Sequence, residues 1–282
     1  MGMNHPGEIA ALCRIARPGY GLITNIGKAH LEGFGGIQGV IRTKSELYDH
    51  LRSCHGTAFV NLDHPVLARQ AKGVDQVTYG RKPEVSCRGR ILSQRPSLRV
   101  GLRQNDRWLP LNTSLYGAYN FENVLAAACI GKYFHVTAEA VARAIESYVP
   151  DNNRSQVITT AAGNTLIMDA YNANPTSMAS AIRSFHSLAA TRKMLILGDM
   201  LELGNASIRE HQAIVRLLVT LGFDQVILAG EVFSSLPAPA SWHKFTAAEE
   251  AKEWLRNLSP KGFTILLKGS RKMKLESLSD LL

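Results

Sequence analysis

Short apolar runs alternate with helical stretches through the second half of this 282-residue chain, and this order strongly constrains the fold. The runs and stretches, in chain order, are 165–169, 176–188, 194–197, 207–221, 225–229, 247–258 and 263–267. Strands that alternate with helices indicate a mainly parallel sheet with helices on both faces. We therefore predict a Rossmann-like, doubly wound α/β domain over residues 151–282.

The first half of the chain predicts a second α/β domain, over residues 1–150. An apolar run at 21–26, a glycine-rich stretch and helical periodicity over 39–52 form a strand–loop–helix unit. A further strand is predicted at 57–61. A helix precedes the first of these strands with no strand before it, so we expect a domain that lacks its leading strands.

The pattern changes within this first half and at its end. Residues 75–111 show short alternating runs, which predict antiparallel strands. Helical periodicity returns over 122–134 and 137–148, and Pro150, Asp151 and two asparagines then interrupt it. We place the domain boundary there.

Composition narrows the class of protein. The formal net charge is +9, but the basic residues look scattered, so we expect no nucleic-acid partner. The four widely spaced cysteines, Cys13, Cys54, Cys87 and Cys129, predict buried, reduced thiols. Because there is no long apolar run and no signal-like N-terminus, we expect a cytoplasmic protein without a membrane span.

Polar residues follow several predicted strands. His30 and Lys44 flank the glycine-rich turn, where the histidine could bind Mg²⁺, Mn²⁺ or a phosphate. From the residues alone, Lys44 is either a phosphate-binding cation or a solvated helix residue. Asp169 ends an apolar run just before a helix that begins near Pro175, a position that suits anions and metals or forms an ordinary turn.

Three segments carry a resemblance to a known family. They are residues 23–51, the GAYNFEN sequence at 117–123 and the DAYNANPTSM sequence at 169–178. Together they resemble the Mur ligases, ATP-dependent amide-forming enzymes of peptidoglycan assembly. The asparagine-rich string is typical of the branch that adds D-alanyl-D-alanine to UDP-N-acetylmuramoyl-tripeptide through an acyl phosphate. The resemblance therefore implies these two small-molecule substrates, a cytoplasmic location and a monomer.

The resemblance also implies site residues in the first domain. Lys44 would be carbamylated and would hold Mg²⁺ or Mn²⁺ together with His30. Asn120 and Asn123 would contact the adenine of ATP, since an amide both donates and accepts hydrogen bonds. The alternative for Asn120 is a helix cap. Glu46 has no role in the motif, and we expect it to form a solvent-facing salt bridge.

In the second domain the resemblance brings Arg154 and Asp169 to the ATP phosphates and metal. The nucleotide side would be lined by Tyr171, Asn172 and Asn174. The LILGDMLELG segment at 195–204 would border the dipeptide through Asp199 and Glu202. The Lys268, Ser270 and Arg271 side chains match a Lys-Gly-Ser-Arg segment of the family.

One departure from the family pattern bears on activity. The family's nucleotide-binding Gly-Lys-Thr/Ser loop does not occur in the 282 residues. We expect an incomplete central domain, and no ligation by this chain alone. The alternatives are a catalytically inactive nucleotide- and dipeptide-binding protein, or another amide ligase of the superfamily, such as the folylpolyglutamate type.

Overall fold

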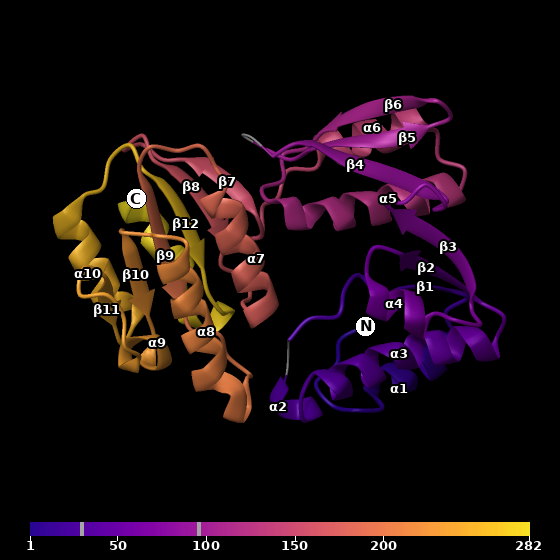
Figure 1. Cartoon of the computed structure of the whole chain (residues 1–282), viewed down its shortest axis with the longest axis horizontal. Helices are drawn as coiled ribbons and strands as arrows, with labels where there is room; N and C mark the ends of the chain where they lie inside the picture. Colours follow the sequence, from indigo (N-terminus) through magenta and orange to yellow (C-terminus); the bar gives the residue numbers. More distant parts are fainter. Residues whose placement is uncertain (29–30, 95–96) are drawn as a thin grey trace. The chain divides into compact units, whose positions relative to one another are not determined.

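The computed structural model describes residues 1–28, 31–94 and 97–282, which form two compact units (Figure 1). Unit 1 comprises residues 1–113 and 118–148, and unit 2 comprises residues 114–117 and 149–282. A boundary placed after residue 150 misses the short segment 114–117. That segment belongs with unit 2, where Tyr116 is buried and near enough to Asp169 for the carboxylate to raise the pKa of its hydroxyl, after burial as the larger cause.

One sheet of six strands forms the frame of unit 1, in the order β1-β2-β3-β4-β5-β6. The strands are β1 Tyr20–Leu22, β2 Thr57–Asn61, β3 Asp75–Gly80, β4 Cys87–Ser93, β5 Arg99–Gln104 and β6 Arg107–Asn112. The pairs from β1 to β4 are parallel, and β4–β5 and β5–β6 are antiparallel. The prediction of antiparallel strands throughout 75–111 is therefore wrong for β3. The helix α4, Pro65–Gln70, carries the chain back between β2 and β3, which allows parallel pairing.

The helices of unit 1 cover both faces of its sheet. They are α1 Glu8–Ala16, α2 Leu31–Phe34, α3 Ile37–Ser53, η1 Ala118–Asn120, α5 Phe121–Tyr133 and α6 Ala138–Ser147. A Cβ at Gly21 would lie 2.8 Å from Leu51 of α3. The neighbouring Tyr20 points the other way, with its ring centroid 5.7 Å from that of Tyr133 on α5. Successive residues of a strand face opposite sides, so α3 and α5 lie on opposite faces.

The strand predicted at 21–26 is shorter than expected. The structure ends β1 at Leu22, and residues 23–28 lie outside any strand. A side chain uses one of these backbone groups, because Lys44 Nζ donates to the carbonyl of Asn25 at 2.8 Å. The apolar run thus predicted the strand, but not that its pairing with β2 ends at Leu22.

Unit 2 has its own six-stranded sheet, in the order β11-β10-β9-β12-β8-β7. The strands are β7 Gln156–Thr159, β8 Thr165–Asp169, β9 Lys193–Gly198, β10 Val226–Ala229, β11 His243–Phe245 and β12 Thr264–Lys268. All neighbours are parallel except the β7–β8 hairpin. The parallel sheet predicted for this half is confirmed.

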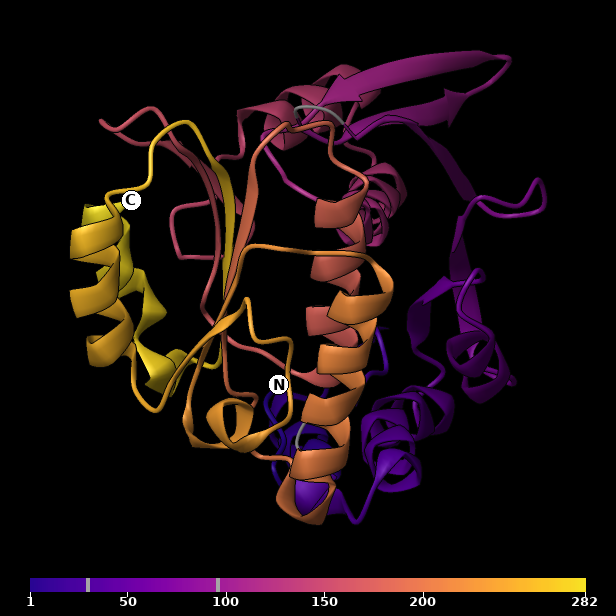
Figure 2. The same cartoon turned by 60° about the vertical axis from the view of Figure 1, so that its left-hand side comes forward.

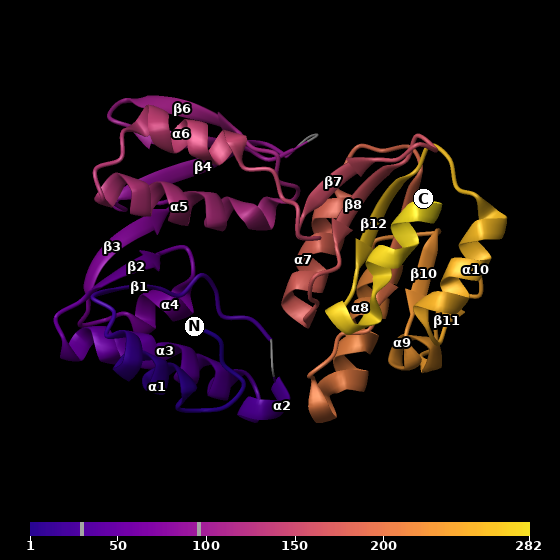
Figure 3. The same cartoon turned by 180° about the vertical axis from the view of Figure 1, so that it is seen from behind.

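Helices lie on both faces of the unit 2 sheet (Figures 2 and 3). They are α7 Pro175–His186, η2 Gly204–Ala206, α8 Ser207–Thr220, α9 Glu231–Ser235, α10 Ala248–Leu258, η3 Arg271–Met273 and η4 Leu275–Leu281. The α10 and η4 helices pack on one face through Leu255 and Leu278, against strand residues such as Ile265. The α7 and α8 helices cover the other face. The doubly wound architecture is confirmed, and among the described residues no helix is long and apolar enough to cross a bilayer.

Candidate functional site

An ion pair sits where the carboxyl ends of β8, β12 and β9 meet. Lys268, at the end of β12, is paired in register with Asp169, at the end of β8. Its Nζ lies 2.7 Å from Asp169 Oδ2 and also donates to the carbonyl of Asn172 at 3.2 Å. The lysine side chain is only 2% exposed. Lys268 is therefore part of the buried framework of this edge, and it orients Asp169.

Two exposed arginines flank Tyr171 on the same edge. The guanidinium carbon of Arg154 lies 3.8 Å from the ring centroid of Tyr171, and that of Arg271 lies 5.2 Å from it. The hydrogen bond from Arg154 is the largest cause of a lowered pKa of the tyrosine hydroxyl, and the charges of both arginines add to it. Guanidinium groups bind phosphate and carboxylate well, so this cluster is suited to an anion.

Ser270 ties three loops of the edge together. Its Oγ accepts from the backbone N–H of Leu201 at 2.9 Å and donates to the carbonyl of Ala173 at 3.5 Å. Its own N–H donates to the carbonyl of Asp199 at 3.1 Å. Ser270 is 4% exposed. The contacts make it a positioning residue for the loops after β8 and β9.

The carboxylate of Asp199 points into the protein. Its two oxygens accept the backbone N–H groups of Val232 and Phe233, each at 2.9 Å, in the first turn of α9. A Cβ at Gly230 would lie 2.3 Å from Asp199 Cγ, and Gly230 has φ 129°. The carboxylate of Asp199 thus holds the start of α9. A contact between Asp199 and the dipeptide, as predicted, would have to come from its backbone or from the loop that follows it.

His211 supports the same loop from α8. It is fully buried, its Nδ1 donates to the carbonyl of Ser207 at 2.8 Å, and its Nε2 accepts from the N–H of Met200 at 2.9 Å. This pattern fixes the neutral tautomer with the proton on Nδ1. Burial lowers the pKa of the imidazole, although Asp199 acts in the opposite direction. The 3.5 Å approach of Asp199 Oδ1 to Nε2 is consequently a contact with a neutral ring rather than an ion pair.

The predicted asparagines and glutamate of these loops differ in exposure. Asn174 Oδ1 accepts from the N–H of Ser177 at 2.9 Å and caps α7, with a reciprocal bond from the backbone of Asn174 to Ser177. Asn172 is exposed, and its Oδ1 accepts from the N–H of Ala173. Glu202 is exposed and has a left-handed φ of 62°. Asn172 and Glu202 therefore point outward, whereas Asn174 shapes the start of a helix.

In unit 1, Lys44 lies beside a cavity of about 280 Å³. The cavity is also lined by Leu22, Ile23 and Thr24, which end or follow β1. Burial lowers the pKa of the Lys44 ammonium, whose Nζ donates to the carbonyl of Asn25. A lowered pKa increases the fraction of neutral amine, the form that reacts with electrophiles. The predicted partner, His30, lies outside the described residues.

The two predicted adenine contacts lie together at the start of α5. Asn123 Nδ2 donates to Asn120 Oδ1 at 3.1 Å. Asn120 occupies the N-cap position of α5, but its side chain makes no capping hydrogen bond. The capping role that we considered for Asn120 is thus not what the structure shows.

Glu46 has a role that the sequence did not suggest. Its Oε1 accepts the N–H of Gly7 at 2.8 Å, and its Oε2 accepts the N–H of Ala10 at 2.9 Å. Gly7 occupies the N-cap position of α1 and has no side chain to cap the helix, so Glu46 of α3 supplies the acceptors. Both carboxylate oxygens thus accept backbone N–H groups, at a residue for which we expected a solvent-facing salt bridge. A glycine at a helix start was the signal that an outside acceptor was needed.

Comparison with known proteins fits both units. Residues 1–131 match the Mur ligase middle domain, and residues 153–271 match the Mur ligase, glutamate ligase domain. The chain belongs to the Mur ligase family. The predicted resemblance is confirmed.

Several members of the Mur ligase family match nearly the whole chain. The UDP-N-acetylmuramoyl-tripeptide–D-alanyl-D-alanine ligase of Bacillus subtilis is 31% identical, over 99% of this chain and 62% of that protein. A crystal structure of MurF from Acinetobacter baumannii has a TM-score of 0.85 at 30% identity, over 99% of this chain and 62% of the other. MurF from Thermotoga maritima, in complex with ADP, has a TM-score of 0.85 at 22% identity, which shows the fold alone; the match covers 99% of this chain and 64% of the other. The chain thus spans about three fifths of the length of the first two proteins.

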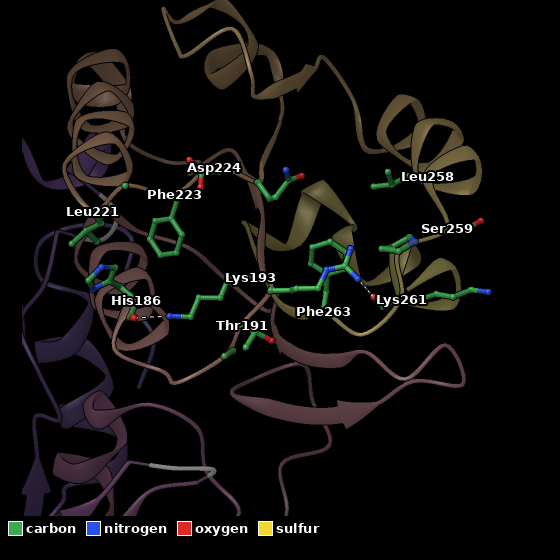
Figure 4. Close-up of a pocket in the computed structure, with 15 residues that line it drawn as sticks. His186, Thr191, Lys193, Leu221, Phe223, Asp224, Leu258, Ser259, Lys261 and Phe263 are labelled. Carbon is green, nitrogen blue, oxygen red and sulfur yellow. Dashed lines mark hydrogen bonds between the residues drawn. The ribbon is translucent and has the colours of Figure 1, made fainter.

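A large cavity of this Mur ligase chain lies away from the predicted residues (Figure 4). Its volume is about 820 Å³, and residues that precede or begin β9, β10 and β12 line it, among them Lys193, Gln225 and Phe263. In Figure 4 Lys193 Nζ donates to the carbonyl of His186 at 2.6 Å. Open parallel sheets bind ligands at the carboxyl ends of their strands. The candidate site is accordingly the opposite, carboxyl edge, despite the size of this cavity.

Among the described residues the cysteines are free thiols, and no metal site is already formed. All four cysteines are free thiols, but Cys54 is exposed, which corrects the expectation that all are buried. Within residues 1–28, 31–94 and 97–282, no group of three or more His, Cys, Asp and Glu side chains is arranged to hold a metal ion. A metal site that uses Lys44 would need the lysine to become an anionic ligand.

Proposed function

We propose that this chain forms the lysine-bearing central part and the C-terminal part of an ATP-dependent ligase that joins D-alanyl-D-alanine to UDP-N-acetylmuramoyl-tripeptide. The observation that carries the proposal is the carboxyl edge of unit 2. There Arg154 and Arg271 flank Tyr171 beside the Lys268–Asp169 ion pair. The relatives of the chain are named as ligases of this kind.

The arginine pair supports a role in binding ATP phosphates. Both guanidinium groups are exposed and lie next to the loop after β8. Asp169 keeps a side-chain exposure of 13% while Lys268 holds it in place. In this proposal Arg154 and Arg271 bind phosphate oxygens, Asp169 faces the nucleotide-bound Mg²⁺, and Tyr171, Asn172 and Asn174 form the nucleotide side of the loop.

Lys44 supports the second part of the proposal, a carbamylated metal ligand. A neutral amine attacks CO₂, forms an N–C bond and releases one proton, which converts the side chain into an anionic carbamate. The lowered pKa of Lys44 favours that neutral amine. The carbamate and His30 would then hold Mg²⁺ or Mn²⁺, which neutralises charge on the transferred phosphoryl group when bound.

The remaining predicted residues divide into contact and positioning roles. Asn120 and Asn123 offer amide donors and acceptors for adenine. The exposed Glu202 is a candidate contact for the ammonium of the dipeptide. Asp199, Ser270 and Lys268 act by fixing the loops around it, because their polar groups are engaged within unit 2.

The proposed reaction has two balanced steps. The tripeptide carboxylate attacks the γ-phosphoryl group of ATP, so that an acyl phosphate forms and ADP leaves. The amine of D-alanyl-D-alanine then attacks the acyl carbon, an amide forms, and phosphate and a proton leave. The proposed compartment is the cytoplasm, where free thiols such as those of this chain persist.

Nucleotide binding gives the first test, with the 282-residue chain and Mg²⁺–ADP in titration calorimetry. We expect binding that Arg271→Gln weakens about tenfold, because a charge-assisted contact is lost. Lys272→Gln is the matched control, since it removes the same charge from the next exposed residue. Equal effects of the two substitutions, or no binding of ADP, would remove the basis of the proposed site.

Ligation is tested separately from binding. Phosphate release that requires ATP, UDP-N-acetylmuramoyl-tripeptide and D-alanyl-D-alanine together would establish it. The 282 residues contain no Gly-Lys-Thr/Ser loop, so we expect no turnover by this chain alone, and a nucleotide- and dipeptide-binding protein is the alternative function. Binding of ADP without such turnover would support that alternative.

Carbamylation of Lys44 is tested by carbon-13 NMR. With ¹³C-labelled bicarbonate and Mg²⁺, we expect a carbamate carbon resonance that disappears in Lys44→Arg and persists in Lys72→Arg. The signal should weaken when the metal is chelated, because the anion gains most from a bound cation. An unchanged spectrum in Lys44→Arg would refute the assignment of Lys44.

A further inference from the structure

Arginine side chains gather on the outer side of the antiparallel strands β4, β5 and β6. Alternate residues of a strand face the same side, and the register places Arg103 opposite Trp108 and Gly101 opposite both Arg90 and Pro110. We call this surface the arginine face. Its members are Arg88, Arg90 and Leu92 of β4, Arg99, Gly101 and Arg103 of β5, and Trp108 and Pro110 of β6.

The other side of the same strands is the core side. Val100 and Leu111 are fully buried, and a Cβ at Gly89 would lie 2.3 Å from Leu125 of α5. Within unit 1, α5 and α6 lie on this side of the three strands (Figures 1 and 3). The arginine face consequently points away from the helices, and the proposed ligase chemistry does not use it.

Three arginines surround a single tryptophan on this face. The guanidinium carbons of Arg90, Arg103 and Arg88 lie 4.2, 5.5 and 5.6 Å from the ring centroid of Trp108. Arg88 is further oriented by a hydrogen bond of 3.0 Å to the carbonyl of Arg81. The sheet and the ring therefore bring these cations together, although they come from two strands, β4 and β5.

The charge of the face is only weakly compensated. In the part of the chain that the structure describes, Asp106 is the one carboxylate in an ion pair with an arginine of this face. It lies 3.1 Å from Arg103 and is fully exposed, so solvent screens the pair. Arg99 bonds instead to the neutral Asn112 at 2.8 Å, whose amide donates in turn to the carboxylate of Glu146 at 3.1 Å. An excess of positive charge is left on a surface of three paired strands.

Apolar side chains lie on the arginine face together with these charges. Leu92 is 39% exposed, Trp108 is half-buried and Pro110 is exposed. Gly101 lets them approach, since a Cβ there would meet Leu92 and Trp108 at 3.2 and 3.3 Å. Arginine beside tryptophan and leucine is the composition of protein surfaces that rest on the headgroup region of a bilayer.

We propose that the arginine face binds the surface of membranes that contain anionic lipids. Rows of arginines on strands about 4.8 Å apart present several cations to neighbouring headgroup phosphates at once. Single-stranded nucleic acid fits less well, because bases stack on open aromatic faces and the ring of Trp108 is already flanked by arginines. The binding would hold the protein at a membrane surface without insertion of a helix.

Vesicle co-sedimentation tests the proposal with the 282-residue chain. We expect binding to vesicles of equal parts phosphatidylcholine and phosphatidylglycerol, little binding to phosphatidylcholine alone, and release by high salt. Arg90→Gln/Arg103→Gln should weaken binding about tenfold or more, because each basic residue near an anionic surface contributes about a fivefold gain. The control Arg183→Gln/Arg256→Gln removes equal charge from exposed positions of α7 and α10 and should weaken it less than about twofold.

A second readout follows the tryptophan and does not depend on charge substitutions. The mixed vesicles should shift the fluorescence of the wild-type chain to the blue, and Trp108→Phe should lose that shift, since Trp242 is buried and Trp254 packs against the core of unit 2. Absence of binding to the mixed vesicles, equal losses in the two double variants, or an unchanged shift in Trp108→Phe would overturn the proposal. Tighter binding of a poly(dT) oligonucleotide than of vesicles, lost in Arg90→Gln/Arg103→Gln, would overturn it in favour of a nucleic-acid surface.

Discussion

The carboxyl edges of the two sheets hold their polar side chains in different ways. In unit 2, Lys268, Ser270, Asp199 and His211 bind to one another's loops, and each is at most 4% exposed. In unit 1, the described hydrogen bond of Lys44 is to a backbone carbonyl, and the side chain lies beside a cavity. The comparison shows that polar side chains at the carboxyl edge of a parallel sheet can be bonded within the protein, as in unit 2, or can lie beside a cavity, as Lys44 does in unit 1.

Topology explains the difference. β12 lies between β8 and β9, so the loops that follow three neighbouring strands converge and can bond to each other. In unit 1, β1 forms one edge of the sheet among the described residues, and Lys44 lines its cavity with residues that follow that strand. A central strand gathers partners from both sides, whereas an edge strand gathers them from one.

Loss of Lys268 should have the largest effect. Lys268→Met leaves the carboxylate of Asp169, with 13% side-chain exposure, without its cation, and we expect the free energy of unfolding of unit 2 to fall by about 3 kcal/mol. Urea unfolding with hydrogen exchange resolved by unit measures it. The exposed control Lys261→Met should change it by less than about 0.5 kcal/mol. A loss no greater than the control's would break the contrast between the two edges.

Ser270→Ala should have the next largest effect. The N–H of Leu201 loses its acceptor and the loops after β8 and β9 lose a common partner, which should cost about 1–2 kcal/mol. The same unfolding measurement applies, with Ser279→Ala as control because that hydroxyl bonds within its own short helix, to the carbonyl of Glu276. Faster amide exchange confined to the loops around residues 173 and 201 would sharpen the comparison, and unchanged exchange there would contradict it.

Glu46→Ala should affect unit 1 alone, and more modestly. Removal of the acceptors for Gly7 and Ala10 should destabilise α1 by about 1 kcal/mol, seen as faster exchange of its amides. Asp49→Ala serves as control, since that residue lies on the same helix in an exposed pair with Arg52. Equal exchange in both variants would show that α1 does not depend on the outside cap.

The smallest expected effect is a pH dependence from His211. Its folded pKa lies below the ordinary 6.5, so the unfolded chain binds the proton more readily. Stability from the neutral ring is complete above pH 6.5 and is lost as the pH falls toward the lowered value. Thermal midpoints at about pH 7.5 and about pH 5.5 should differ less in His211→Gln than in the wild type or in His186→Gln. A dependence that survives His211→Gln would assign it to other groups.

Local patterns predicted much of this molecule. The alternation of apolar runs with helices fixed the order of β8, α7, β9, α8, β10, α10 and β12, because burial periodicity is written into neighbouring residues. The start of α7 at Pro175, after the asparagine at 174, followed from the same local chemistry. Motif similarity identified the family and named the lysine, arginines and asparagines, whose functional roles remain predictions.

Tertiary structure decided what depends on residues far apart in the chain. The Lys268–Asp169 pair joins positions 99 residues apart, and Glu46 accepts from the N-cap residue Gly7, 39 residues earlier in the chain. The arginines of β4 and β5 looked scattered, yet strand register set them around Trp108. Sequence periodicity specifies which side of an element is buried, but the partner across a sheet or helix is set by register and chain crossing. Whether a polar residue is free for a ligand or bound within the fold was therefore decided only when the chain had folded.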